Sequence, residues 1–294
     1  MVIALSECEL IHMPLKTVLF SLAILLIVLS QVAFSAEVAI TLDDLPYVNP
    51  SQNSPDEGLA IVKAVNGALS LHGITAIGFV VGGQISRKTK PALQAFIDDG
   101  HQVGNHSWTH PDYGTLTVKE FRKEVHKTDR ALRGWMGDTK FFRFPYLREG
   151  ETPEAKAAAE SVLAALGYVN APVSIDNDEW RYNSEYVMAL AAGDAARAKA
   201  IGAEYVEHIQ ERTVHFQTLA QDALGHDVKH ILLLHMNKIN ADYLGDLLDW
   251  YAGEGWSFIS LKEAMSDPLY SAPDLYAGPR GLSQIERVVG LKSN

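Results

Sequence analysis

Four short clusters along this chain of 294 residues contain the side-chain types that metal-assisted hydrolysis requires. His106 and His110 are four positions apart, which on a helical turn lets two imidazoles share one metal ion. The spacing alone is a weak signal, because the chain has eleven histidines, and the pair could instead be a turn cap and a surface residue. Asp44 is the natural third ligand, since one carboxylate and two imidazoles leave a coordination position open for water or substrate.

Three further side chains could act at such a site. Asp43 adjoins Asp44, and two neighbouring carboxylates repel each other unless positive charge lies beside them. Arg143 can hold Asp43 ionised and oriented. His235 ends an apolar run and can act as a general acid if it faces the cleft. Each of these residues also has an interpretation without a catalytic role. Asp43 and Asp44 could be a solvated acidic pair, Arg143 a surface arginine before a proline turn, and His235 a histidine at the edge of the core.

These candidates fall at or just after the carboxyl ends of predicted strands. Period-two patterns and apolar runs predict strands over 37–42, 74–81, 101–105, 141–143, 168–175, 229–235 and 256–259. About seven β/α units of this length favour a closed or nearly closed barrel of parallel strands. Barrels and open α/β sheets bind ligands at this edge, so the candidate side chains are expected to meet.

Capping signals and apolar spacing predict helices between the strands. They cover 58–72, 91–99, 117–136, 153–166, 241–252 and 261–265, and residues 184–224 also look mostly helical. The tail over 268–294 contains Pro268, Pro273 and Pro279, and we expect it to be irregular and to lie along the surface.

The first 36 residues have a different composition from the rest. Lys16 precedes an apolar run over 17–29, which fits a signal-peptide core and is short for a membrane span. Small residues near Ser35 and Ala36 offer a cleavage site, and the alternative is an uncleaved N-terminal anchor. Cys8 is the one cysteine and lies in this segment, so the remaining chain forms no disulfide. We expect a bacterial periplasmic or secreted protein with no integral membrane domain after signal cleavage.

Composition and charge limit the class of partner. The chain is 47% hydrophobic and 21% charged, which supplies a full core and argues against disorder. Its net charge of −11 disfavours nucleic acid and anionic lipid as partners and is compatible with a neutral or cationic sugar polymer.

The ordered motifs resemble those of the polysaccharide deacetylase family, the NodB-homology carbohydrate esterases. Thr41–Asp44 resembles the family's T-F-D-D, with Leu42 in place of Phe, and His106–His110 matches H-[ST]-x-x-H. Arg143–Tyr146 resembles R-x-P-Y, and Leu233–His235 matches L-x-H. Asp176–Trp180 resembles a looser D-x-x-D-W motif, with Glu179 in place of the second Asp. The resemblance covers roughly residues 37–267 as a catalytic domain and implies a distorted (β/α) barrel.

The resemblance also implies a cofactor and the residues that use it. The cofactor would be one divalent metal ion, Zn²⁺ in the first place and Co²⁺ or Ni²⁺ as alternatives. Asp44, His106 and His110 would hold it, while Asp43 would be the base and His235 the acid.

Five more residues receive roles from the resemblance. Arg143 would orient Asp43, and Tyr146 would offer its backbone N–H to an oxyanion hole. Asp176 or Glu179 would support Arg143 or His235. Trp180 would wall the acetyl pocket, unless it is a core aromatic. A helix-rich insertion over about 181–228 is unusually long for the family and could reshape the substrate groove.

The expected activity is removal of N-acetyl, or O-acetyl, groups from an acetylated carbohydrate. The same residues could instead hydrolyse another non-peptide C–N bond, such as a formamide or a cyclic amide. From a different class, the chain could be a catalytically silent carbohydrate-binding protein, because a fold does not fix a function.

Overall fold

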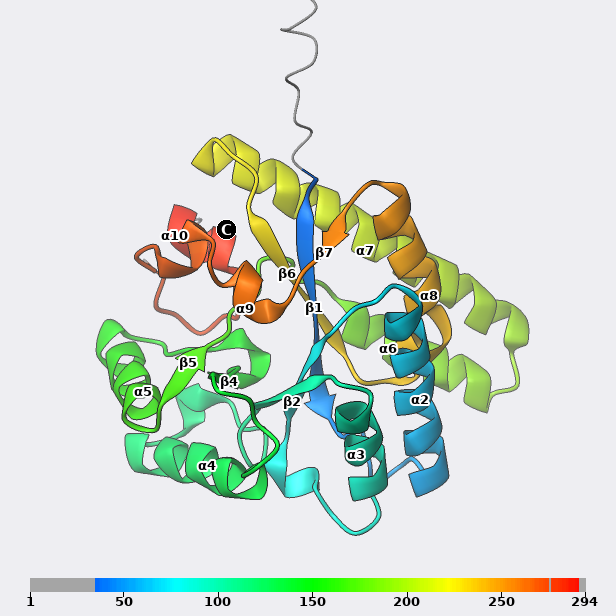
Figure 1. Cartoon of the computed structure of the whole chain (residues 1–294), viewed down its shortest axis with the longest axis horizontal. Coiled ribbons are helices and arrows are strands. Elements are labelled where there is room, and N and C mark those ends of the chain that lie inside the picture. The colour runs from blue at the N-terminus through cyan, green and yellow to red at the C-terminus, as the bar shows by residue number, and fades with distance from the viewer. Residues whose placement is uncertain (1–34, 275, 291–294) are drawn as a thin grey trace, which may run out of the picture. The chain divides into compact units, whose positions relative to one another are not determined.

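In the computed structural model, which describes residues 35–274 and 276–290, seven parallel strands form one sheet surrounded by helices (Figure 1). The strand order is β5-β4-β3-β2-β1-β6, and β7 also pairs with β1. The strands are β1 (Glu37–Leu45), β2 (Ile77–Val80), β3 (Gln102–Asn105), β4 (Lys140–Phe142), β5 (Tyr168–Asn170), β6 (Lys229–His235) and β7 (Ser257–Phe258). The predicted signal peptide or anchor lies outside the described residues, apart from Ser35 and Ala36.

One extended segment, residues 168–175, closes the sheet between β4 and β6. It begins as β5 against β4, and the Ala171 N–H donates to the Phe142 carbonyl at 2.8 Å. It ends against β6, where the N–H groups of Ser174 and Ile175 donate to the Ile231 carbonyl at 3.0 and 3.1 Å. Because β6 pairs with β1, the ring of strands continues around, as expected for a distorted (β/α) barrel.

Alternate side chains along β1 point to opposite faces of the sheet, one toward the hydrophobic core and the other toward the candidate site. Val38, Ile40 and Leu42 point to the core that lies between the sheet and its helices. The intervening residues Thr41 and Asp43 are buried on the other face, which is the barrel interior. A one-residue shift in register would exchange the two faces, so burial of the apolar set fixes where the Asp43 carboxylate lies.

Helices cover the outside of the ring, and capping residues fix several of their starts (Figure 1). Ser54 and Thr117 form capping boxes with Glu57 and Glu120. The segment expected as a helix-rich insertion, about 181–228, consists largely of two helices packed on each other, α6 and α7. The helices are α2 (Pro55–Leu71), α3 (Lys90–Asp98), α4 (Val118–Ala131), α5 (Pro153–Ala165), α6 (Glu179–Ala191), α7 (Ala195–Leu224), α8 (Lys238–Gly253), α9 (Leu261–Ala264) and α10 (Gln284–Val289).

The tail differs from the expectation of an irregular surface segment. It contains a 3₁₀ turn at Pro268–Ser271 and the helix α10, which Ser283 and Glu286 cap reciprocally. Arg287 of α10 is only 1% exposed, so this helix packs into the protein. The prolines suggested irregular structure, and the capping pair, which predicts a helix start, was overlooked.

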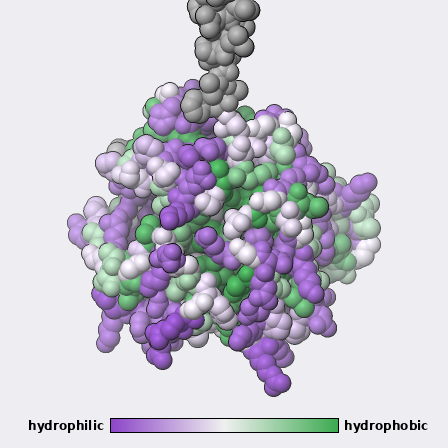
Figure 2. Space-filling model, viewed as in Figure 1, coloured by the Kyte–Doolittle hydropathy of each residue, from purple (hydrophilic) through white to green (hydrophobic). Residues whose placement is uncertain are grey.

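Hydrophilic residues cover much of the face shown in Figure 2, with hydrophobic residues between them near its centre. Among the described helices, none combines the length and the apolar character needed to cross a bilayer.

Candidate metal and catalytic site

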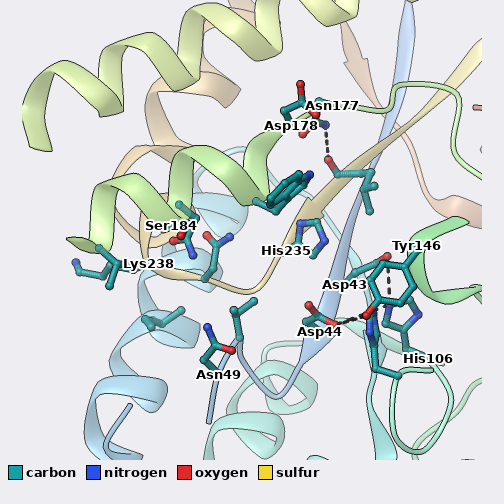
Figure 3. A pocket seen from close by; sticks show the side chains of 18 of the residues that line it. Asp43, Asp44, Asn49, His106, Tyr146, Asn177, Asp178, Ser184, His235 and Lys238 are labelled. Atoms are coloured by element: carbon teal, nitrogen blue, oxygen red, sulfur yellow. Dashed lines mark hydrogen bonds and ion pairs between the residues drawn. The ribbon is translucent and has the colours of Figure 1, made fainter. Parts of the chain in front are cut away.

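The strands bring most of the predicted site residues into one pocket of about 860 Å³. Asp43 and Asp44 lie near the end of β1, His106 follows β3, and His235 ends β6. In Figure 3, Asp43, Asp44, His106 and Tyr146 are gathered at one end of the pocket, and His235 lies beside them.

Asp44, His106 and His110 form a cluster whose potential ligand atoms all lie within 4.8 Å of one another. The Asp44 Oδ1 atom is 3.4 Å from His110 Nε2 and 3.9 Å from His106 Nε2. The His106 Nδ1 is 2.9 Å from the Arg143 carbonyl, so an Nδ1–H donor leaves the Nε2 lone pair directed at Asp44. A carboxylate with two such imidazoles fits a divalent cation with an open coordination position.

The electrostatics of this cluster also suit a cation. Burial, together with the neighbouring His106, lowers the pKa of His110 to about 4, which keeps its imidazole neutral and able to bind a metal. Burial acts to raise the pKa of Asp44, but the adjacent imidazoles outweigh it and lower that pKa. Near neutral pH the cluster therefore presents a negative Asp44 carboxylate and a neutral His110 imidazole.

Several residues around the pocket have left-handed backbone conformations that side chains other than glycine seldom adopt. The φ angle is 63° at Asp44, 64° at Ser107 and 57° at His110, and it is 58° at Tyr146 and 55° at Leu147. Each such residue costs of order 1–3 kcal/mol and persists only where its surroundings hold it. This concentration of strain at one pocket is typical of a functional site.

Glu124 of α4 holds the loop that carries His106 and His110. Its carboxylate accepts hydrogen bonds from the N–H groups of Trp108 and Thr109 at 3.0 and 2.7 Å, and from the Thr109 hydroxyl at 3.0 Å. The sequence does not indicate this role, because a glutamate on an amphipathic helix carries no local signal of a distant partner.

Arg143 and Asp43 form a buried ion pair at the floor of the pocket. The Arg143 Nη1 donates to Asp43 Oδ1 at 2.9 Å and to Thr41 Oγ1 at 2.7 Å, and Nε donates to the Ala171 carbonyl at 2.9 Å. Burial lowers the pKa of Arg143 and the Asp43 charge counteracts that, but a guanidinium stays protonated. The other Asp43 oxygen, Oδ2, lies 3.5 Å from His106 Nε2. Arg143 thus fixes one carboxylate oxygen and leaves the other at the metal cluster.

Glu179 supports His235, which decides between the two carboxylates that the sequence left open. The His235 Nδ1 is 2.6 Å from Glu179 Oε2, and Asn237 and Asn240 donate to Glu179 Oε1. Burial opposes a charged His235, but the buried Glu179 outweighs it and raises the pKa of His235 to about 9. His235 is therefore held protonated at neutral pH. The two asparagines were not predicted.

Asp176, the other of the two carboxylates that the sequence left open, does not support His235. It lines the pocket, burial raises its pKa to about 6, and its carbonyl accepts from Arg212 Nε of α7 at 3.0 Å. Neither Arg143 nor His235 hydrogen bonds to it among the described contacts. Trp180 also lines the pocket and is 60% exposed, so it is not a core aromatic.

Comparison with known proteins matches residues 35–170 to the family described as polysaccharide deacetylase. These residues belong to the polysaccharide deacetylase family. The matched range holds Asp43, Asp44, His106, His110 and Arg143, whereas Glu179 and His235 come from the rest of the chain.

Several curated proteins resemble this chain. The peptidoglycan-N-acetylglucosamine deacetylase of Bacillus cereus is 29% identical over 50% of this chain and 47% of its own length. The Listeria monocytogenes protein of that description is 26% identical over 50% of this chain and 27% of its own length. A chitin deacetylase of Pestalotiopsis is 25% identical over 64% of this chain and 57% of its own length. The chain thus spans about a quarter to just over half of these relatives.

Solved structures share the fold of this chain. The chitin deacetylase of Colletotrichum lindemuthianum has a TM-score of 0.54 at 20% identity, covering 78% of this chain and 87% of its own. A pseudoenzyme of carbohydrate esterase family 4 from Bacillus anthracis has a TM-score of 0.52 at 16% identity, covering 79% of this chain and 66% of its own. Because a pseudoenzyme shares the fold, activity has to be argued from the site residues.

Proposed function

We propose that this protein removes N-acetyl, or O-acetyl, groups from a carbohydrate in a reaction that requires one divalent metal ion, Zn²⁺ in the first place. One observation supports this above all. Two pairs lie beside one carboxylate–imidazole cluster: Asp43 is hydrogen bonded to the guanidinium of Arg143, and Glu179 keeps His235 protonated. A base and an acid with opposite charges at one pocket are what acyl hydrolysis needs.

Each residue then has a defined task. Asp43 accepts a proton from the water that attacks the acyl carbon, through the oxygen that Arg143 leaves free. The Tyr146 N–H donates to the oxyanion that forms. His235 gives its proton to the leaving nitrogen or oxygen as the C–N or C–O bond breaks, so the products are acetate and a free amine or hydroxyl. Asp44, His106 and His110 would hold a divalent cation, which would supply Lewis-acid polarisation of the acyl group and a lower pKa for water.

The lining of the pocket supports a neutral sugar substrate. Trp180, Val187 and Met188 of α6 face the pocket, as do the amide side chains of Asn49 and Gln52. Apolar surface with a few polar groups binds the faces and hydroxyls of a polar ligand.

The charges in the pocket favour the same class of substrate. Three cationic side chains line the described pocket: Arg148, Lys238 and the protonated His235. Each is paired with a carboxylate, that of Asp112, Asp242 and Glu179 respectively. No cation among the described lining residues is thus left for an anionic sugar. The expected signal at residues 1–36 would place the reaction outside the cytoplasm, where peptidoglycan lies.

The proposal is tested by measuring acetate release from acetylated chitooligosaccharides, peptidoglycan fragments and acetyl-xylan. The Zn²⁺-loaded protein is expected to release acetate from at least one of them. Excess chelator should abolish the release, and added metal should restore it, because the cation would supply the polarisation of the acyl group. Full activity in chelator, with no metal in the protein, would rule out this mechanism.

Release of formate, or opening of a cyclic amide, without acetate release would identify another C–N bond as the target. Ligand binding without turnover would identify a silent binder.

The α6 wall predicts a preference for more than one sugar unit. Met188 lies nine residues beyond Glu179, so it is about 13 Å further along the helix from the residue that holds His235. A single sugar at the metal cluster does not extend that far, whereas the next unit of a chain does. Replacing Val187 and Met188 by Ala should raise KM for a tri- or tetrasaccharide about fivefold, the equivalent of roughly 1 kcal/mol of lost apolar contact. KM for the monosaccharide should stay unchanged.

Leu190 provides the matched control for this prediction. It is 41% exposed on the same helix but does not line the pocket. Leu190→Ala should therefore leave both KM values unchanged. An equal effect of the two variants on short and long substrates would contradict a substrate path along α6.

A further inference from the structure

The backbone turn that carries Tyr146 needs outside support. Tyr146 and Leu147 are consecutive residues with φ angles of 58° and 55°, and the Tyr146 side chain is exposed. Consecutive left-handed residues other than glycine are held only where the surrounding structure fixes them. We call Pro145–Leu147 the Tyr146 turn. The residues that contact this turn therefore set the direction of the Tyr146 N–H.

Arg287 of α10 supplies one such contact. Its Nη2 donates to the Leu147 carbonyl at 2.5 Å, and its Nε donates to the Leu282 carbonyl at 3.0 Å. The buried guanidinium also has Asp274 and Glu149 carboxylate oxygens at 3.4 and 3.6 Å from its Nη1. One side chain thus ties the tail of the chain to the end of the Tyr146 turn, with its charge compensated.

Gly281 supplies the second contact. A Cβ atom at this position would lie 2.0 Å from the Tyr146 carbonyl oxygen and 3.0 Å from the Leu147 Cβ. The backbone of residue 281 therefore packs directly on the turn, and no larger residue fits unless the turn moves. Gly281 also lines the pocket that holds the metal cluster.

We propose that the C-terminal segment, residues 276–290, is part of the catalytic apparatus, in which Gly281 and Arg287 position the Tyr146 turn so that its N–H meets the acyl oxygen. The inference rests on the proposed function, in which this N–H stabilises the oxyanion. Gly281 and Arg287 are positioning residues, since they act through the Tyr146 turn. Both lie beyond residues 35–170, the range that matches the family.

Gly281→Ala is the sharpest test, because it adds one methyl group and removes no charge. We expect kcat to fall at least tenfold, since removing an oxyanion donor costs 10²–10³ in kcat and here the donor is displaced rather than lost. KM should change less than twofold. The affinity for Zn²⁺ should also be unchanged, because Gly281 is not in contact with Asp44, His106 or His110. Gly245→Ala is the control, since a Cβ there has no neighbour within 4 Å.

Arg287→Lys gives a second test that keeps the charge. A lysine ammonium cannot reproduce the planar fork that reaches two carbonyls and two carboxylates. Hydrogen–deuterium exchange of the peptide spanning residues 144–150 should become faster in this variant, while exchange in β1 is unchanged. Arg280→Lys, at an exposed arginine in the same segment, should leave exchange unchanged.

The outcomes separate positioning from general stability. A lower kcat and faster exchange at the Tyr146 turn, with KM and metal affinity retained, would support the proposal. Wild-type kcat and exchange in Gly281→Ala would overturn it, as would a parallel loss of metal affinity and melting temperature. If the wild-type protein releases acetate from no substrate, the proposed function fails. The exchange measurements would then still decide whether the C-terminal segment holds the turn.

Discussion

Asp43→Asn is expected to lower kcat by about 10³-fold while metal binding stays at one ion per chain. Asparagine keeps the size of the side chain and an oxygen that can accept from Arg143 Nη1, but it cannot take a proton from water. The proposed metal ligands Asp44, His106 and His110 are untouched. The measurement is acetate release under saturating substrate, together with the metal content of the same sample.

Two controls make this result specific. Asp178→Asn removes another carboxylate from the lining of the same pocket, at an exposed position, and should leave kcat unchanged. The melting temperature of Asp43→Asn should also be measured. Loss of a buried partner charge costs about 3–5 kcal/mol when it leaves its counter-ion alone, although the retained amide oxygen reduces that cost. A folded, metal-loaded Asp43→Asn protein with wild-type kcat would show that Asp43 is not the base.

Glu179→Gln is expected to shift the alkaline limb of the pH–rate profile to lower pH by more than one unit. His235 acts as an acid, so activity falls as pH rises through its pKa, which Glu179 and the neighbouring carboxylates raise to about 9. A bound divalent cation would lower that pKa, so the wild-type limb should lie at or below 9. In the variant, burial is opposed only by more distant charges, so the pKa falls. The loss of kcat should therefore be small at pH 5.5 and should grow with pH.

The control for this experiment is Glu185→Gln on the same helix. Glu185 pairs with Arg181 and Arg197 at the surface and does not contact His235, so its replacement should leave the profile in place. A Glu179→Gln profile that is lowered equally at every pH, with no displacement, would mean that Glu179 only holds α6 in place.

The parts of the site that could be predicted are those that follow from patterns among residues close together in the sequence. The β-rich run over 37–42 predicted a strand that leads into Asp43, and the structure extends that strand to Leu45. The apolar run over 229–235 gave β6 with His235 at its end. The spacing of His106 and His110 suggested a shared metal, and the structure brings both to Asp44. Helix starts were less accurate: the helix expected from residue 58 begins at Pro55, because Ser54 and Glu57 form a capping box.

The residues that were missed act across the fold rather than along the chain. Glu124 reaches a loop fifteen and sixteen residues away, and Asn240 reaches Glu179 across 61 residues. Arg287 meets Leu147 across 140 residues. No local pattern distinguishes these from any other polar residue on a helix, because their partners are defined only once the strands and helices have packed.

The position of β1 has a consequence for how this protein can be divided. The first strand of the chain pairs with β6 along its length from Glu37 to Asp43, and β6 comes from residues 229–235. A fragment ending at residue 170, where the family match stops, would therefore leave a long apolar strand with an open edge. Such edges recruit other chains. During synthesis the same edge stays open until β6 is made, so this interval is the period in which the nascent chain most needs protection from aggregation.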